Sequence, residues 1–206
     1  MSGCDCEIEI KDKSESKTLI ILLAINALMF IVELIAGLIA QSTALIADSL
    51  DMLADATVYG IALYAVGKAA NIKTRAASFS GYAQILLACI ALVDISRRII
   101  FGSEPEPPFM IIVGCIALVA NSICLSIVAR HKQGEVHMRA SYIFSKVDVL
   151  ANLGVVTAGI LVYFFHTSWP DIIVGLLIVL LVANGARLIL QDVKRSRRQE
   201  QGCCDD

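Results

Sequence analysis

Residues 43–66 read TALIADSLDMLADATVYGIALYAV, an apolar stretch that contains Asp48, Asp51 and Asp55. It is long enough to cross a membrane, because a spanning helix needs about 20 mostly apolar residues. A carboxylate at bilayer depth costs at least ~2.5 kcal/mol on the most lenient scale, and such residues usually mark an ion or proton pathway. The stretch therefore predicts a membrane helix with a face that handles cations.

Five further apolar stretches of this kind fill most of the chain. With the first, they cover residues 18–40, 43–66, 76–101, 109–129, 142–165 and 172–190. The chain is 57% hydrophobic and 17% charged, whereas soluble domains lie nearer ~45–50% and ~25%. The stretches are continuous, unlike the alternating strands of a membrane barrel. We therefore expect an all-α membrane protein, a six-transmembrane-helix bundle.

The charged residues divide the chain and orient it. The bundle is predicted over residues 18–192, between a polar tail at 1–17 and a basic, cysteine-containing tail at 193–206. The polar start and the length of the first apolar stretch do not fit a signal peptide. Lys and Arg concentrate in both tails and in the connections after the second and fourth stretches, while 41–42 and 166–171 contain none. The positive-inside rule therefore predicts cytoplasmic N- and C-termini.

Arg97 and Arg98 are the exception, because they lie at the predicted outer end of the third helix. Asp94 precedes them by three and four residues, so the three charges can neutralise one another on one helical face. We keep the orientation and expect a multi-pass integral protein of the cell (inner) membrane.

The polar residues inside the membrane predict a site for a divalent cation. Asp48, Asp51 and Asp55 follow at i+3 and i+4 and so share one helical face. Asp148 and Asn152 repeat the i,i+4 spacing at similar depth in the fifth stretch. Two such oxygen pairs can enclose one metal ion, which offsets the repulsion between buried carboxylates. The metal would be the transported substrate, and we expect no organic cofactor.

Two acidic residues near this site have open interpretations. Asp48 lies nearer the outside, either as an entrance or supporting residue or as a polar contact between helices. Glu33 in the first stretch either lines a hydrated path or is protonated against a neighbour. Both are therefore secondary candidates for the metal site.

An internal similarity points to the same residues. The segment DMLAD at 51–55 resembles DVLAN at 148–152. One lies in the second of the first three helices and the other in the second of the last three, which predicts a 3+3 inverted repeat. Coupling-ion sites of such transporters lie near the midplane between the halves.

The cysteines form two groups. Cys4, Cys6, Cys203 and Cys204 lie in the polar tails, either as thiolates that capture a soft metal or as incidental thiols. Cys89, Cys115 and Cys124 lie within apolar stretches and are predicted to be packing residues.

Taken together, these features resemble the cation diffusion facilitator family of divalent-metal/proton antiporters. In the segment STALIADSLDMLAD at 42–55, Asp51 and Asp55 match the two ligand positions of the family's second helix. In RASYIFSKVDVLANLG at 139–154, Asp148 matches the second ligand position of its fifth helix. The likeness covers nearly all of 18–192. It implies a secondary transporter that exports zinc, manganese, iron, cobalt or cadmium from the cytosol in exchange for protons.

The sequence departs from the family pattern at two places. The other ligand of the fifth helix, commonly His, falls on Phe144, which cannot bind metal. An all-oxygen ligand set suits Mn²⁺, Fe²⁺ or Mg²⁺, although zinc accepts carboxylates too. The sequence also ends shortly after the sixth stretch, so we expect no cytoplasmic metal-sensing and dimerising domain. Any homodimer would then rest on transmembrane contacts.

Two other functions remain open at this stage. Acidic rings also line passive cation channels, although these usually need several subunits. A non-transporting membrane metal sensor or scaffold would keep the site without the transport cycle. Motifs such as H-E-x-x-H, G-x-S-x-G and the P-loop do not occur, so we do not expect an enzyme. The expected partners are a divalent metal ion, protons and lipid, and not nucleic acid.

Overall fold

Six long helices make up the part of the chain that the computed structural model describes, residues 13–65, 70–129 and 136–202. They are α1 (Lys13–Ile39), α2 (Thr43–Ala65), α3 (Ala70–Phe101), α4 (Pro107–Ala129), α5 (Val136–Phe165) and α6 (Trp169–Gly202). Four are long and apolar enough to span a membrane, over residues 16–39, 107–129, 145–165 and 169–195. The prediction of an all-α membrane bundle is confirmed.

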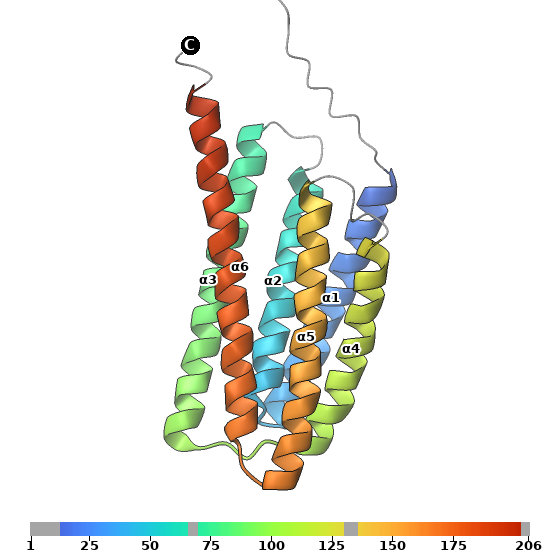
Figure 1. The fold of residues 1–206 in the computed structure, drawn as a ribbon, viewed down its shortest axis with the longest axis vertical. Helices are drawn as coiled ribbons and strands as arrows, with labels where there is room; N and C mark the ends of the chain where they lie inside the picture. Colours follow the sequence, from blue (N-terminus) through green and yellow to red (C-terminus); the bar gives the residue numbers. More distant parts are fainter. Residues whose placement is uncertain (1–12, 66–69, 130–135, 203–206) are drawn as a thin grey trace, which may run out of the picture.

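The helices run up and down in succession, so that α1 begins and α6 ends at the same end of the bundle (Figure 1). We call this the inner end. The opposite, outer end carries the connections 40–42, 102–106 and 166–168. These names follow the orientation predicted from the positive charges, which stays a prediction.

Neighbouring helices pack in pairs along the bundle. α1 lies along α2, α4 lies along α5, and α3 lies along α6, while α2 also contacts α3, α5 and α6 (Figure 1). α2 is therefore the central helix, with neighbours on every side.

The helices extend beyond the predicted apolar stretches, and they do so at the inner end. α1 begins at Lys13 rather than residue 18, and α6 continues to Gly202 rather than residue 190. Apolar length reports the thickness of the hydrocarbon layer, whereas backbone hydrogen bonds can continue a helix into the polar region. Helix therefore reaches into both predicted tails, whose boundaries as domains stay predictions.

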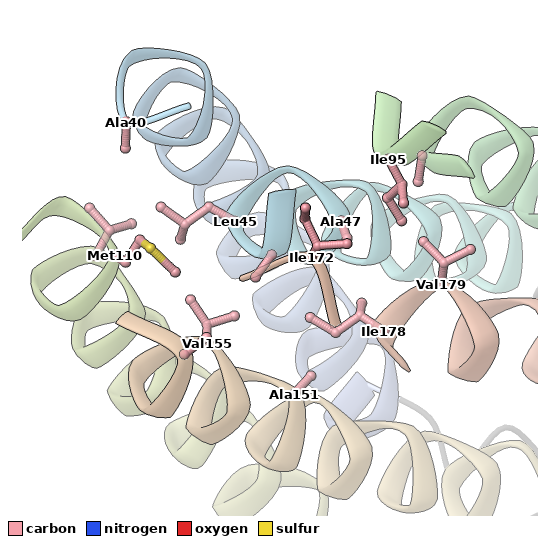
Figure 2. Packing of buried hydrophobic residues seen from close by; sticks show 14 of the residues in the cluster. Ala40, Leu45, Ala47, Ile95, Met110, Ala151, Val155, Ile172, Ile178 and Val179 are labelled. Carbon is pink, nitrogen blue, oxygen red and sulfur yellow. The ribbon is translucent and has the colours of Figure 1, made fainter. Parts of the chain in front are cut away.

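The largest buried apolar cluster lies toward the outer end. Figure 2 shows Leu45 of α2, Met110 of α4, Val155 of α5 and Ile178 of α6 within it. Two smaller clusters, around Met52 and around Tyr59, lie farther toward the inner end. The outer half of the bundle is thus the more continuously packed half.

Candidate metal-binding site

α2 turns its aspartates into the bundle rather than toward lipid. The relative exposure of Asp48, Asp51 and Asp55 is 0%, 8% and 5%. The i+3 and i+4 spacing places all three on the face that meets the neighbouring helices. On α5, Asp148 and Asn152 are exposed by only 4% and 0%. All five side chains are therefore interior groups.

Asp55 and Asp148 form the contact between the two helices. Their carboxyl groups are within hydrogen-bonding reach of each other. The Tyr59 hydroxyl, one turn farther along α2, donates a hydrogen bond to Oδ2 of Asp55 at 3.4 Å. This long bond gives one carboxylate oxygen of Asp55 a donor from its own helix. The structure thus brings together the ends of two segments that are 93 residues apart in sequence.

Asp51 lies beside this pair but does not complete a cage with it. Its carboxylate interacts electrostatically with those of Asp55 and Asp48. Within the described residues, no three His, Cys, Asp or Glu side chains are close enough to hold one ion. Positions i and i+4 are about one helical turn apart. Enclosing one ion would therefore require the three carboxyl groups to lie closer together than they do in this structure.

Asn152 is held in a single orientation. Its Nδ2 donates a hydrogen bond to the backbone carbonyl of Asp148 at 2.7 Å. Its Oδ1 is buried and accepts no hydrogen bond from a donor of the described residues. The amide oxygen is therefore the atom with unused acceptor capacity.

Two side chains that sequence reasoning did not assign to the site lie next to it. Tyr59 is the hydrogen-bond donor to Asp55. Cys124 of α4 is 1% exposed, and its thiol interacts electrostatically with Asp55 and Asp148. On α4, the buried residues Asn121, Cys124 and Val128 follow at helical spacing. This face, which mixes polar and apolar residues, was the signal in the sequence that could have indicated that Cys124 lies inside the bundle. Cys89 and Cys115, also predicted to pack inside, are exposed instead.

Cys4, Cys6, Cys203 and Cys204 lie outside the described residues, as does the side chain of Phe144.

Glu33 lies against Asp48 on the α1 side of α2. Both side chains have 0% exposure. The Glu33 carboxyl group is within hydrogen-bonding reach of Asp48 and interacts electrostatically with Asp51 as well. Glu33, Asp48, Asp51, Asp55 and Asp148 therefore form a continuous series of interacting carboxyl groups through the bundle.

Comparison with known proteins identifies the family. The model of the cation efflux transmembrane domain matches residues 19–196. The chain belongs to the cation efflux family. With four apolar helices of spanning length among the residues that the structure describes, it is an integral multi-pass membrane protein of a transporter family.

Three curated relatives illustrate the similarity. The metal cation efflux system protein CzcD of Cupriavidus metallidurans is 25% identical over 85% of this chain and 59% of that protein. The cadmium, cobalt and zinc/H(+)-K(+) antiporter of Bacillus velezensis is 26% identical over 87% and 62%. The zinc transporter ZitB of Yersinia pseudotuberculosis is 27% identical over the same shares. The chain spans about three-fifths of the length of these relatives.

At the outer end of this cation efflux domain, Asp171 links α6 to the start of α2. Its carboxylate accepts hydrogen bonds from the Ser42 hydroxyl at 2.6 Å and from the backbone N–H groups of Thr43 and Ala44 at 2.6 and 2.9 Å. An acidic group at a helix N-terminus satisfies free amides and complements the helix dipole. Sequence analysis placed Asp171 in a connection, whereas it is the third residue of α6. It therefore caps a helix other than its own.

Arg98 fastens the same turn from α3. Its guanidinium donates to Oδ2 of Asp94 at 2.6 Å and to the backbone carbonyl of Gln41. Gln41 has a φ of 48°, in the left-handed region. Arg97 pairs with Asp94 at 3.0 Å. The prediction that Asp94 neutralises both arginines is confirmed.

Proposed function

We propose that this chain exports a divalent metal cation from the cytosol in exchange for protons. Asp51, Asp55 and Asp148 would bind the ion near the membrane midplane, with the Asn152 amide oxygen as a fourth group. The observation that carries the proposal is the buried Asp55–Asp148 pair, which joins two helices inside an apolar bundle. Burying two carboxyl groups in contact is unfavourable unless a cation or protons neutralise them.

The exchange of metal for protons follows from the same oxygens. A metal ion requires deprotonated carboxylates, so metal and protons compete for one set of atoms. In an inverted-repeat bundle, rocking of helix groups around a midplane site would present it to each side in turn. One relative by sequence, from Bacillus velezensis, is named as a cadmium, cobalt and zinc/H(+)-K(+) antiporter. That relation supports the proposal for this chain.

The donor set bears on which metal is carried. Carboxylate and amide oxygens suit Mn²⁺ and Fe²⁺ as well as Zn²⁺. The names of the relatives mention zinc, cadmium and cobalt, and the buried Cys124 sulfur lies near the pair. Zinc is therefore the first substrate to test, followed by cadmium, cobalt, manganese, iron and nickel.

The test is metal-driven proton movement in proteoliposomes that contain a pH-sensitive dye. Asp55→Asn and Asp148→Asn should each lower the zinc-dependent rate by about 100-fold or more, because each removes an anionic ligand. Glu104→Gln is the matched control, since this carboxylate is exposed in the outer connection. It should transport at the rate of the unsubstituted chain.

Three outcomes would contradict the proposal. Equal transport by the Asp55 and Asp148 variants would remove the site. Zinc flux that is independent of the pH gradient and does not saturate would indicate a passive channel. Zinc binding without any flux would indicate a sensor or scaffold.

A further inference from the structure

A second buried acidic pair lies outside the proposed site. Glu33 of α1 and Asp48 of α2 are both fully buried. Their four carboxylate oxygens receive no hydrogen bond from any donor of the described residues. The two carboxyl groups are nevertheless within hydrogen-bonding reach of each other. Because both groups are acceptors when ionised, something positive must lie between them when they carry charge.

Three acidic groups elsewhere in the described part of the bundle receive hydrogen bonds from the protein, whereas the oxygens of this pair do not. Asp171 accepts three hydrogen bonds from α2 and its preceding turn. Asp94 is paired with Arg97 and Arg98. Asp55 receives the Tyr59 hydroxyl. Buried polar groups are normally satisfied in this way, so the unpartnered oxygens of Glu33 and Asp48 point to a ligand.

The pair is placed between the midplane site and the outer end. Asp48 follows Ser42 by six residues, about 9 Å along α2. Asp55 lies seven residues farther in, about 10 Å beyond Asp48. Asp51 lies between the two levels and interacts with both Asp48 and Asp55. A cation that leaves the midplane toward the outer end along this face of α2 would meet Asp51 and then Asp48 with Glu33.

Hydrogen bonds hold together the outer end beyond the pair. Asp171 binds the first amides of α2, and Arg98 binds the turn at Gln41. The N–H of Glu106 also donates to the Ala40 carbonyl at 2.9 Å. These contacts join the α1–α2 turn to α3, α6 and the residue that precedes α4. The acidic pair therefore lies about 9 Å along α2 from this hydrogen-bonded turn.

We propose that Glu33 and Asp48 form a second cation-binding station, which receives the divalent metal from the midplane site before the outer end opens. The inference rests on the proposed export function and adds a separate place on the exit path. Two carboxylates from different helices offer up to four oxygens to a hard or borderline divalent ion. The second station and the midplane site lie about two helical turns apart along α2, so one ion can pass between them over a short distance.

Equilibrium dialysis of the full chain against Zn²⁺ tests the station directly. The four terminal cysteines are replaced by serine in every sample, so that their thiols do not contribute. A chain with Asp51→Asn, Asp55→Asn and Asp148→Asn should still bind about one Zn²⁺. Adding Glu33→Gln and Asp48→Asn should abolish that binding, and adding Glu104→Gln instead should leave it unchanged.

Transport separates this inference from the proposed function. With the midplane site intact, Glu33→Gln with Asp48→Asn should lower the maximal zinc rate by about tenfold, with KM at the inner side changed by less than about threefold. If the dialysis shows no zinc at the second station, the proposed function still holds as long as transport depends on Asp55 and Asp148. Absence of zinc transport by the unsubstituted chain would instead remove the proposed function.

The station is overturned if the midplane triple variant folds and binds no zinc, which would leave the pair as a structural contact that shares a proton. It is also overturned if zinc binding to that variant survives Glu33→Gln with Asp48→Asn. Should the variants with carboxylate substitutions not fold in detergent, the chain that carries only the four cysteine-to-serine substitutions decides. Its titration should saturate at about two Zn²⁺ per chain, and saturation at one would contradict the inference.

Discussion

The Ser42 hydroxyl donates a hydrogen bond to Oδ1 of Asp171 at 2.6 Å, across 129 residues of sequence. The same carboxylate accepts the backbone N–H groups of Thr43 and Ala44. One side chain of α6 thus holds the first turn of α2, the helix that carries Asp51 and Asp55 of the proposed site. The position of the site is set partly by a group at the end of the bundle.

Asp171→Asn should therefore destabilise the protein. The substituted amide places an NH₂ group opposite a backbone N–H, which leaves one buried donor of α2 unsatisfied. We expect the free energy of unfolding to fall by about 1–3 kcal/mol. Thermal or denaturant unfolding in detergent measures this, with the exposed Glu104→Gln as control. Equal stability of the two variants would show that the cap contributes nothing measurable.

The contact between α6 and α2 predicts an effect of glycine substitution. A Cβ added at Gly175 would lie 2.8 Å from Cγ2 of Thr43 and 3.1 Å from the Thr43 backbone carbonyl. Backbone atoms cannot rotate away, so Gly175→Ala should push the helices apart and lower the free energy of unfolding by about 1–3 kcal/mol.

Gly60→Ala is the matched control on α2. There the nearest side-chain atom to an added Cβ is Cδ1 of Leu23 at 3.9 Å, an ordinary contact. Alanine is the better helix former by about 1 kcal/mol, so this variant should be neutral or more stable. The same unfolding assay compares both. A loss at Gly60 as large as that at Gly175 would rule out the steric explanation.

The six helices could be predicted from sequence because apolar length and continuity are local properties. The neutralisation of Arg97 and Arg98 by Asp94 was local too, since all three share one helical turn. The inner helix ends were missed, because α1 and α6 continue through polar residues whose composition resembles a tail.

Long-range contacts could not be predicted in the same way. Asp171 was assigned to a connection, and its role as a helix cap could not be predicted because its partners lie 127–129 residues away in sequence. Glu33 was recognised as unusual, but its pairing with Asp48 depends on how α1 packs on α2. In the sequence, Cys124 could not be distinguished from other small apolar residues, because its position near Asp55 depends on how α4 packs in the bundle. The sequence could nominate Asp51, Asp55, Asp148 and Asn152 as ligands, and transport assays must test that assignment.

Tyr59→Phe should weaken the site without abolishing it. The variant keeps the ring and removes only the hydroxyl that donates to Asp55 at 3.4 Å. Because this hydrogen bond is long, we expect a change in the KM for zinc of less than about tenfold, equivalent to ~1.4 kcal/mol. Proteoliposome transport at several zinc concentrations measures it. A loss as complete as in Asp55→Asn would show that Tyr59 itself takes part in transport.

Acidification of the inner side should raise the KM for zinc and leave the maximal rate nearly unchanged. Protons and zinc compete for the same carboxylate oxygens, and a higher proton concentration favours the protonated site by mass action. If binding displaces one proton, KM should rise by up to about tenfold for each pH unit lowered. Initial zinc flux at inner pH values between 6 and 8 provides the measurement. A fall in maximal rate at constant KM would contradict competition and place the pH-dependent step elsewhere in the cycle.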